Sequence, residues 1–422
     1  MVMATHSDRD LIAAAAAIDE ARLWSHLVAF GEIGGIGAGG VCRLALGAEE
    51  LAARGYIVNC AQSRGYRVFV DPIANLFVRR DGTDPEAAPV ITGSHIDTQP
   101  QGGRFDGAYG VLAALEALAA LDGASVQTRR PIEVVAWTNE EGVRFTPGAM
   151  GSMVFSGALA LGDIAGRRGS DGVTLSAALA SALAATPQAT FRPTVRPIAA
   201  YVEAHIEQGP ELEAKGIPIG VVEGIQGVRW FDVDVVGSGA HAGTTPLSRR
   251  RDAFQDALRL ISALNEWMSD PNDVLRFTVG RFEVTPNSRN TVPARVRFGI
   301  DLRHPDADVL REKGDRIAAI AAAAAGHCEV SVREVFTKAP ATFDRHVIDS
   351  IETATRLLRI PSVRMPSGAF HDALFLNDVC PTGMIFIPCA RGISHDPAES
   401  ITAAQAATGA RVLAATLVAL AA

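Results

Sequence analysis

Two adjacent carboxylates, Glu140 and Glu141, lie just after an apolar run in the stretch PIEVVAWTNEEGVRF. Neighbouring carboxylates repel each other and are costly to remove from water. A pair of this kind is therefore most often part of a solvated loop. A chemical role for this pair requires partners elsewhere in the sequence.

Histidines offer such partners. Five of the ten lie in polar, glycine-rich junctions at the ends of strand-like runs, namely His95, His205, His241, His371 and His395. A single histidine is more often structural. Several at strand ends, mixed with Asp97 and Asp106, favour a metal site, because ligands gather at the carboxyl ends of strands in open α/β sheets. Imidazole and carboxylate without cysteine suit zinc, manganese, cobalt or nickel.

The composition limits the cell compartments in which the protein is expected and the partners it is expected to bind. The five cysteines are scattered and form no C-x-x-C pair, which favours a reducing cytoplasm over a disulfide framework or a thiolate zinc site. The net charge of -8 argues against nucleic acid or an anionic membrane as the main partner. The N-terminus is typical of an amphipathic helix rather than a signal peptide, and no apolar run reaches the length of a membrane span. We therefore expect a cytoplasmic protein.

Other catalytic motifs are missing or lack their context. Residues 35–40, GIGAGG, fit G-x-G-x-x-G formally, but the preceding ARLWSHLVAF is helix-like and no β-α-β unit surrounds it. The sequence has no G-x-S-x-G, no P-loop and no H-E-x-x-H. Dinucleotide binding, serine hydrolysis and nucleotide hydrolysis thus lack their main signals.

The order of the elements predicts how these residues are positioned. Strand-like RVFVDP, PVITGSH, RPIEVVAWT, YVEAHIEQG and PTGMIFIP alternate with helical stretches such as GAYGVLAALEALAAL. This alternation predicts an α/β domain with a central mixed sheet and helices on both faces. Within residues 220–333 the order becomes β-α-β-β-α-β, the split ferredoxin-like pattern. We expect a metal-binding catalytic domain in two pieces, residues 1–219 and 334–422, around this insertion.

Seven motifs in order make the chain resemble the M20 metallopeptidase family, specifically its hydantoinase/carbamoylase branch. They are GSHIDTQPQGGRFDG, TNEEGVRF, EAHIEQGP, GIQGVRW, AHAGTTPLSRRRDA, NTVPARVRFGIDLRH and GISHDPAE. The resemblance runs from about residue 25 to the C-terminus. It implies a catalytic domain that binds two divalent metal ions per subunit, with an inserted domain that serves as lid and as the surface of a homodimer.

Ligand roles follow from the resemblance, residue by residue. His95 and His205 would bind one ion, and Asp106 would bridge both. Glu141 and His395 would complete the second ion's ligands. A carboxylate stands at the position of His205 in many M20 peptidases, so the histidine points to the carbamoylase branch. Asp97, two residues after His95, would orient its imidazole.

The catalytic roles are implied in the same way. Glu140 would take a proton from the attacking water and return it to the leaving nitrogen. We expect the two glutamates to point in opposite directions along an extended chain. His241 would stabilise the oxyanion. Because His241 lies in the insertion, it would act after lid closure or from the other subunit of a dimer.

The substrate is expected to be a small molecule with a free carboxylate. Arg303 would bind that carboxylate in two-point fashion. Asn290 and Gln208 would add amide hydrogen bonds, and Gly368 its backbone. His371 has either a positioning or a structural role. The chain departs from the family pattern at Phe370, where a glycine usually precedes HDA, and at Ala74, where the family usually has glycine.

The expected reaction is metal-dependent hydrolysis of the carbamoyl group of an N-carbamoyl-L-amino acid to the amino acid, ammonia and carbon dioxide. Allantoate amidohydrolase, β-ureidopropionase and an M20 aminoacylase or dipeptidase would use the same metals with a different pocket. A binding protein that has lost catalysis is disfavoured, because it would not need Glu140 as a base.

Overall fold

The computed structural model describes residues 7–193 and 197–422, and the chain divides into two compact units. Unit 1 comprises Met1–Glu223 and Thr342–Ala422, and unit 2 comprises Gly224–Ala341. Unit 2 thus begins four residues after the predicted start of the insertion and ends eight residues after its predicted end. The later end reflects the last long strand of unit 2, which continues to Lys338.

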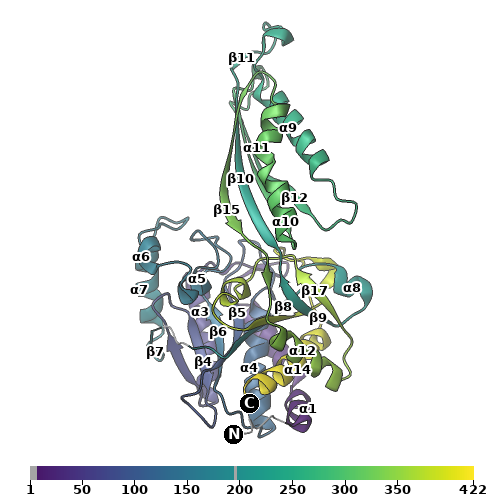
Figure 1. Cartoon of the computed structure of the whole chain (residues 1–422). Helices are drawn as coiled ribbons and strands as arrows, with labels where there is room; N and C mark the ends of the chain where they lie inside the picture. The colour runs from purple at the N-terminus through teal and green to yellow at the C-terminus, as the bar shows by residue number, and fades with distance from the viewer. Residues whose placement is uncertain (1–6, 194–196) are drawn as a thin grey trace. The chain divides into compact units, whose positions relative to one another are not determined.

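Unit 1 is a mixed α/β fold, as predicted (Figure 1). Its strands are β1 (Gly35–Gly37), β2 (Gly40–Val41), β3 (Arg67–Val70), β4 (Leu76–Arg80), β5 (Val90–His95), β6 (Ile132–Trp137), β7 (Thr190–Phe191), β8 (Ala200–Ile206), β9 (Ile219–Ile225, which ends in unit 2), β16 (Ala341–Thr342), β17 (Ser362–Ser367) and β18 (Thr382–Ile387). Its longer helices are α1 (Asp8–Ala16), α2 (Glu20–Gly31), α3 (Ala48–Ser63), α4 (Ala108–Gly123), α7 (Leu175–Ala185), α12 (Arg345–Leu357) and α14 (Ala403–Leu420). Short helices are α5 (Met150–Ser156), α6 (Leu161–Ile164), α8 (Glu211–Lys215) and α13 (Ala373–Leu376).

The central strands of the large sheet are parallel. The sheet has the order β16-β9-β18-β8-β5-β6-β4-β3-β7, with β17 paired to β9. Strands β18, β8, β5 and β6 run parallel to one another, and β4 and β9 are antiparallel to their neighbours in this group. Every residue of the four parallel strands is buried, so both faces of the sheet are covered there.

Unit 2 is a four-stranded antiparallel sheet packed against three helices. Its elements are β10 (Gly227–Val236), β11 (Ala240–His241), α9 (Ala253–Trp267), β12 (Arg276–Thr285), β13 (Thr291–Val292), β14 (Arg295–His304), α10 (Ala307–Asp315), α11 (Ile317–Ala324) and β15 (Glu329–Lys338). The long strands have the order β12-β14-β10-β15, and β11 pairs separately with β13. The order β10-α9-β12-β14-α10/α11-β15 matches the predicted βαββαβ pattern.

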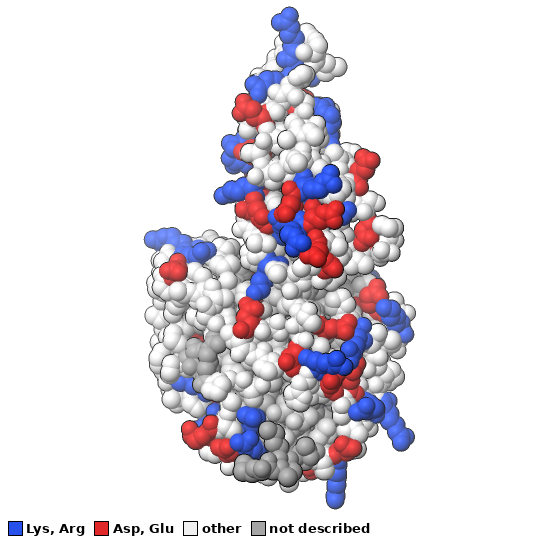
Figure 2. Space-filling model, in the orientation of Figure 1, with Lys and Arg blue, Asp and Glu red and all other residues white. Residues whose placement is uncertain are grey.

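Alternation of side chains separates the two faces of the unit 2 sheet. Phe231, Val233 and Val235 of β10 join a core with Phe298 and Leu260 of α9. The intervening residues carry charge, and ion pairs cross the strands from Arg281 and Arg333 to Asp232. Figure 2 shows blue and red side chains intermixed on the face in view. Charges of both signs therefore alternate on this face (Figure 2).

Several local predictions need correction. The stretch PLSRRRDAFQDALRLISALNEWM has the pattern of one amphipathic helix from residue 246, but the helix begins at Ala253. Asp252 caps it and accepts hydrogen bonds from Phe254 and Gln255. The basic SRRR segment therefore precedes this helix instead of starting it. The stretch PDADVLREKGDRIAAIAAAA, which the sequence predicts as one helix, forms two helices that meet at Arg316. The GIGAGG stretch is part of the hairpin β1–β2.

The N-terminal and C-terminal helices also differ from expectation. The predicted N-terminal helix is the pair α1 and α2, separated at residues 17–19, and residues 1–6 lie outside the described part of the chain. By length and composition α14 could span a membrane, contrary to the sequence analysis. However, 67% of that apolar window is buried within the protein. It has the burial of a core helix.

Candidate metal centre and active site

The candidate site lies at the carboxyl ends of the parallel strands. Strand β5 ends at His95, and His205 is the sixth of the seven residues of β8. Glu140 and Glu141 follow β6, and His395 follows β18. Because these strands are parallel neighbours, their ends meet at one edge of the sheet, as expected for ligand binding in α/β folds.

The first potential ligand group contains His95, Asp106 and His205. Their ligand atoms all lie within 4.8 Å of one another. Asp106 Oδ1 is 3.6 Å from His95 Nε2 and 3.2 Å from His205 Nε2. The Nδ1 atoms of both rings lie 2.9 Å from backbone carbonyl oxygens, those of Asp97 and Ile206. Donation from Nδ1 to these carbonyls fixes both rings so that Nε2 is the atom presented to an ion.

The second potential group contains Asp106, Glu141 and His395, again within 4.8 Å. His395 Nε2 is 3.1 Å from Asp106 Oδ2 and 3.5 Å from Glu141 Oε2. The His395 side chain is 48% exposed, whereas those of Asp106 and Glu141 are at most 5% exposed. Solvent therefore reaches the site from the side of His395.

The two groups fit a pair of divalent cations. Asp106 turns Oδ1 toward the first group and Oδ2 toward the second, which is the arrangement a bridging carboxylate needs. All donors are imidazole nitrogens and carboxylate oxygens, a set that suits zinc or manganese. Gly107 makes the close approach possible, because its φ is +63° and a Cβ there would lie 2.5 Å from the His95 ring. The number and identity of the ions stay a prediction.

The two adjacent glutamates divide between these groups. Glu140 Oε2 is 3.6 Å from His95 Nε2, and Glu141 Oε2 is 3.5 Å from His395 Nε2. The expected reason for this separation was wrong, because the pair does not lie in an extended segment. It occupies a bend, after Asn139 with φ 57° and before Gly142 with φ 67°.

Asp97 contacts the His95 ring and the two glutamates, and its role in orienting the imidazole stays a prediction. Its backbone carbonyl holds the His95 ring, whereas its carboxylate is 3.7 Å from His95 Nδ1. The carboxylate instead accepts hydrogen bonds from the backbone N–H groups of Glu140 and Glu141, each at 3.2 Å. Asp97 therefore shapes the bend that presents the two glutamates.

Gln208 lies against the bridging carboxylate. Its Nε2 donates to Asp106 Oδ2 at 2.9 Å and lies 3.2 Å from Ser394 Oγ. Its Oε1 is buried and has no hydrogen-bond partner among the described residues. Both Gln208 and His395 have left-handed backbone angles, with φ 57° and 56°. Such conformations are costly for residues other than glycine and concentrate at functional sites.

His371 lies behind His205. The two rings meet edge to face at 4.6 Å, and His371 Nε2 is 3.0 Å from Ser367 Oγ. Burial and the neighbouring His205 hold the pKa of His371 well below its usual value, so the ring is neutral. Gly368 is exposed. Phe370 packs edge to face on Phe375 of α13 at 5.6 Å.

The other three predicted residues lie in unit 2. His241 is paired with Thr291 across β11 and β13, and Ala242 N donates to Asn290 O at 2.9 Å. The structure therefore brings His241 and Asn290 together. Arg303 lies near the end of β14, where Nε and Nη2 donate to the two Asp301 carboxylate oxygens at 2.8 and 2.9 Å. Their roles at the site stay predictions.

Comparison with known proteins adds independent evidence. The model of peptidase family M20/M25/M40 matches residues 91–419. The chain belongs to this family. An N-carbamoyl-L-amino acid amidohydrolase from Geobacillus stearothermophilus is 38% identical over 93% of this chain and 96% of its own length. Allantoate amidohydrolase from Bacillus subtilis is 34% identical over 89% and 91%. The crystal structure of a hydantoinase/carbamoylase family amidase from Burkholderia multivorans has a TM-score of 0.87 and 42% identity, and covers 96% and 98%.

The resemblance inferred from the motifs is thus confirmed, and the protein is an M20-family hydrolase.

The site also contains buried acidic residues that the sequence motifs did not indicate. Glu203 of β8 accepts hydrogen bonds from Ser94 Oγ at 2.6 Å and from Tyr201 at 3.0 Å. Glu399 accepts from the backbone of Phe105 and Asp106. Glu399 belongs to the GISHDPAE motif, but an acidic residue in a polar loop has no distinguishing sequence signal.

Several buried groups of this site have shifted pKa values. Burial would raise the pKa of Asp106, but hydrogen bonds from His205, His395 and His95 outweigh burial and hold it well below its usual value. The hydrogen bond to Asp106 raises the pKa of His395 to about 9. Burial raises the pKa of Glu140 well above its usual value and that of Glu141 to about 7. Metal binding must therefore displace protons.

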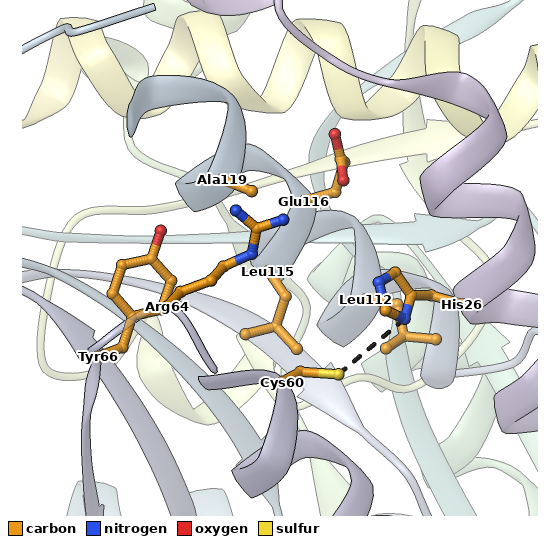
Figure 3. Close-up of a pocket in the computed structure, with 8 residues that line it drawn as sticks. All are labelled: His26, Cys60, Arg64, Tyr66, Leu112, Leu115, Glu116 and Ala119. Carbon is orange, nitrogen blue, oxygen red and sulfur yellow. Dashed lines mark hydrogen bonds between the residues drawn. The ribbon is translucent and has the colours of Figure 1, made fainter. Parts of the chain in front are cut away.

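A separate pocket lies among helices α2, α3 and α4 (Figure 3). It is lined by His26, Cys60, Arg64, Tyr66, Leu112, Leu115, Glu116 and Ala119, none of which is a predicted site residue. Cys60 Sγ lies 4.0 Å from His26 Nδ1. Burial raises the pKa of the Cys60 thiol, so the thiol stays protonated and is a poor nucleophile.

The raised pKa values predict how the stability of the metal-free protein depends on pH. The pKa values of Glu141 and Glu399 are raised to about 7 from 4.5, and the pKa of His395 is raised to about 9 from 6.5. A group whose pKa is higher in the folded than in the unfolded protein stabilises the fold at pH values below its unfolded-state pKa. This stabilisation is lost as the pH rises through its folded-state pKa. His371, whose pKa is lowered, acts in the opposite direction only below about pH 6.5, so the melting temperature of chelator-treated protein should fall between about pH 6.5 and pH 9.

Zinc or manganese should reduce that fall, because the cation replaces the protons. Thermal unfolding followed by circular dichroism, with and without metal, checks both statements. A metal-free protein that becomes more stable across the same range would contradict this assignment of charge.

Proposed function

We propose that the protein hydrolyses N-carbamoyl-L-amino acids. One water is consumed, the bond from the carbamoyl carbon to the α-nitrogen breaks, and the carbamate formed decomposes to ammonia and carbon dioxide. The observation that carries this proposal is the pair of ligand groups sharing Asp106, with Glu140 beside them. Four N-carbamoyl-L-amino acid amidohydrolases, 34–38% identical to this chain, support the choice of substrate class.

Glu140 is the proposed proton carrier. Two bound cations would polarise the carbamoyl oxygen and make the attacking water more acidic. Glu140 would accept the proton of that water at its carboxylate and deliver it to the α-nitrogen as the C–N bond breaks. Its burial raises its proton affinity, which suits a group that must both accept and donate.

Gln208 is the proposed hydrogen-bond acceptor for the ureido group of the substrate. Its amide nitrogen is engaged by Asp106, so its buried Oε1 is the atom available for a substrate. An acceptor without a partner is costly when buried and favours a ligand that brings an N–H donor. A carbamoyl group has more N–H donors than the acyl group of an N-acyl amino acid. This favours a carbamoyl or ureido substrate over that of an aminoacylase.

Arg303 is the proposed partner of the substrate carboxylate. Asp301 binds its Nε and Nη2 and in turn accepts a hydrogen bond from Trp230 Nε1 at 2.9 Å. These contacts hold the guanidinium in one plane. A guanidinium held in this orientation could bind a substrate carboxylate in two-point fashion.

The geometry of unit 2 favours a homodimer. His241 and Asn290 lie at the end of the unit where β11 pairs with β13, and Figure 1 draws β11 at the tip of that unit. Arg303 lies near the other end of β14, eight residues from Arg295, which is roughly 27 Å along a strand. One amino acid derivative cannot contact both ends. If all three residues bind one substrate, they come from two copies of the chain.

The substrate class is tested with manganese or cobalt, by ammonia release from the carbamoyl substrates and allantoate and by amino acid release from N-acyl amino acids. We expect turnover of N-carbamoyl-L-amino acids well above that of N-carbamoyl-β-alanine, allantoate or N-acyl amino acids. In Glu140→Gln we expect kcat to fall by about 100-fold or more while metal content stays at the wild-type level. Glu141→Ala should lose one equivalent of metal. Activity of Glu140→Gln within a few-fold of wild type would remove the proton-carrier role.

Mixing two inactive variants tests whether His241 acts across a dimer. Neither Glu140→Gln nor His241→Ala should be active alone. A mixed dimer has one site with both groups intact only if His241 comes from the neighbouring copy. After subunit exchange, such a mixture should recover about a quarter of the wild-type rate, because half of the dimers are mixed and each has one working site. If activity does not recover although the subunits exchange, His241 acts at the active site of its own subunit.

A further inference from the structure

Glu399 joins two distant loops of unit 1. It is 4% exposed and lies four residues after His395, between β18 and α14. Its Oε1 accepts hydrogen bonds from the backbone N–H groups of Phe105 at 2.8 Å and Asp106 at 3.0 Å. Its Oε2 accepts one from Ser394 Oγ at 2.9 Å. One carboxylate thus connects the loop that carries Asp106 to the loop that carries His395.

Ser394 continues this connection to the ligand atoms. Its hydroxyl lies 3.0 Å from Asp106 Oδ2, which is the oxygen that faces His395 Nε2 at 3.1 Å. A hydroxyl has one proton and can donate to Asp106 or to Glu399 at a given moment. A glutamine at position 399 could donate its amide N–H to Ser394, which would leave the Ser394 proton for Asp106.

Gly103 leaves the space that Glu399 fills. A Cβ at this position would lie 2.1 Å from both Cδ and Oε1 of Glu399. Contacts below about 3 Å are not tolerated without displacement. Alanine at position 103 would therefore push Glu399 from Phe105 and Asp106 without changing any charge.

We propose that Glu399 is a positioning residue for the bridging carboxylate. It fixes the backbone of Asp106 against the loop of residues 394–395, so that Asp106 Oδ2 and His395 Nε2 meet at the second ion. Glu399 itself is not among the proposed ligands, so its effect reaches an ion through Asp106, Ser394 and His395. This inference rests on the proposed two-ion site and concerns metal affinity rather than the substrate.

Metal affinity in four variants tests the role. Calorimetric titration with zinc or manganese should give two bound equivalents for wild type. In Glu399→Ala and Gly103→Ala, affinity for one equivalent should fall by about 10- to 100-fold, the usual effect of losing a group that orients a ligand. Glu399→Gln should stay within about threefold of wild type, because it keeps an acceptor for the two backbone N–H groups. Gly166→Ala is the matched control, since a Cβ there meets nothing within 4 Å.

Each outcome decides the inference. Wild-type affinity for both equivalents in Glu399→Ala and Gly103→Ala would overturn it, as would a loss in Glu399→Gln as large as in Glu399→Ala. If Glu399→Ala fails to fold, Gly103→Ala and Glu399→Gln decide in its place. A wild-type protein that binds no divalent ion would remove the proposed function and this inference with it. Two ions bound normally in every variant would remove only the role of Glu399.

Discussion

The arrangement of the site depends on one carboxylate, Asp106, which faces three imidazoles. Its Oδ1 lies 3.2 and 3.6 Å from His205 and His95, and its Oδ2 lies 3.1 Å from His395. Around it the fold buries further carboxylates, including Glu140, Glu141 and Glu399. So much buried negative charge is unfavourable in a protein interior unless cations or protons balance it. The same excess makes the adjacent glutamates useful, because each can face a different ligand group.

The fold maintains this arrangement by placing the candidate ligand residues at the ends of strands. Parallel strands deliver His95, the two glutamates and His205 to one edge of the sheet, and α4 begins two residues after Asp106. Backbone carbonyls hold two of the imidazoles, and Asp97 holds the bend at the glutamates. These contacts fix the ligand atoms without using the atoms that would bind an ion. Preorganisation of this kind limits the reorganisation needed when metal and substrate bind.

The sequence could predict the residues that the motifs contain and the order of the elements around them. The candidate ligand groups could be predicted because His95, Asp106, Glu141, His205 and His395 each lie in a recognisable strand-end motif. The sequence could not reveal the carbonyl contact of Asp97 or the buried Oε1 of Gln208, since both depend on backbone angles. Nor could it reveal that Glu399 contacts a loop 293 residues away. The bend at Glu140 was missed because adjacent residues were assumed to continue the strand.

The central claim is that Asp106 bridges two divalent ions. Anomalous diffraction from crystals grown with zinc or manganese tests it most directly. The account predicts two anomalous peaks about 3.5–4 Å apart, one on each side of the Asp106 carboxylate, with His95 and His205 at the first and Glu141 and His395 at the second. A single peak, or peaks at which Asp106 contacts only one ion, would contradict it.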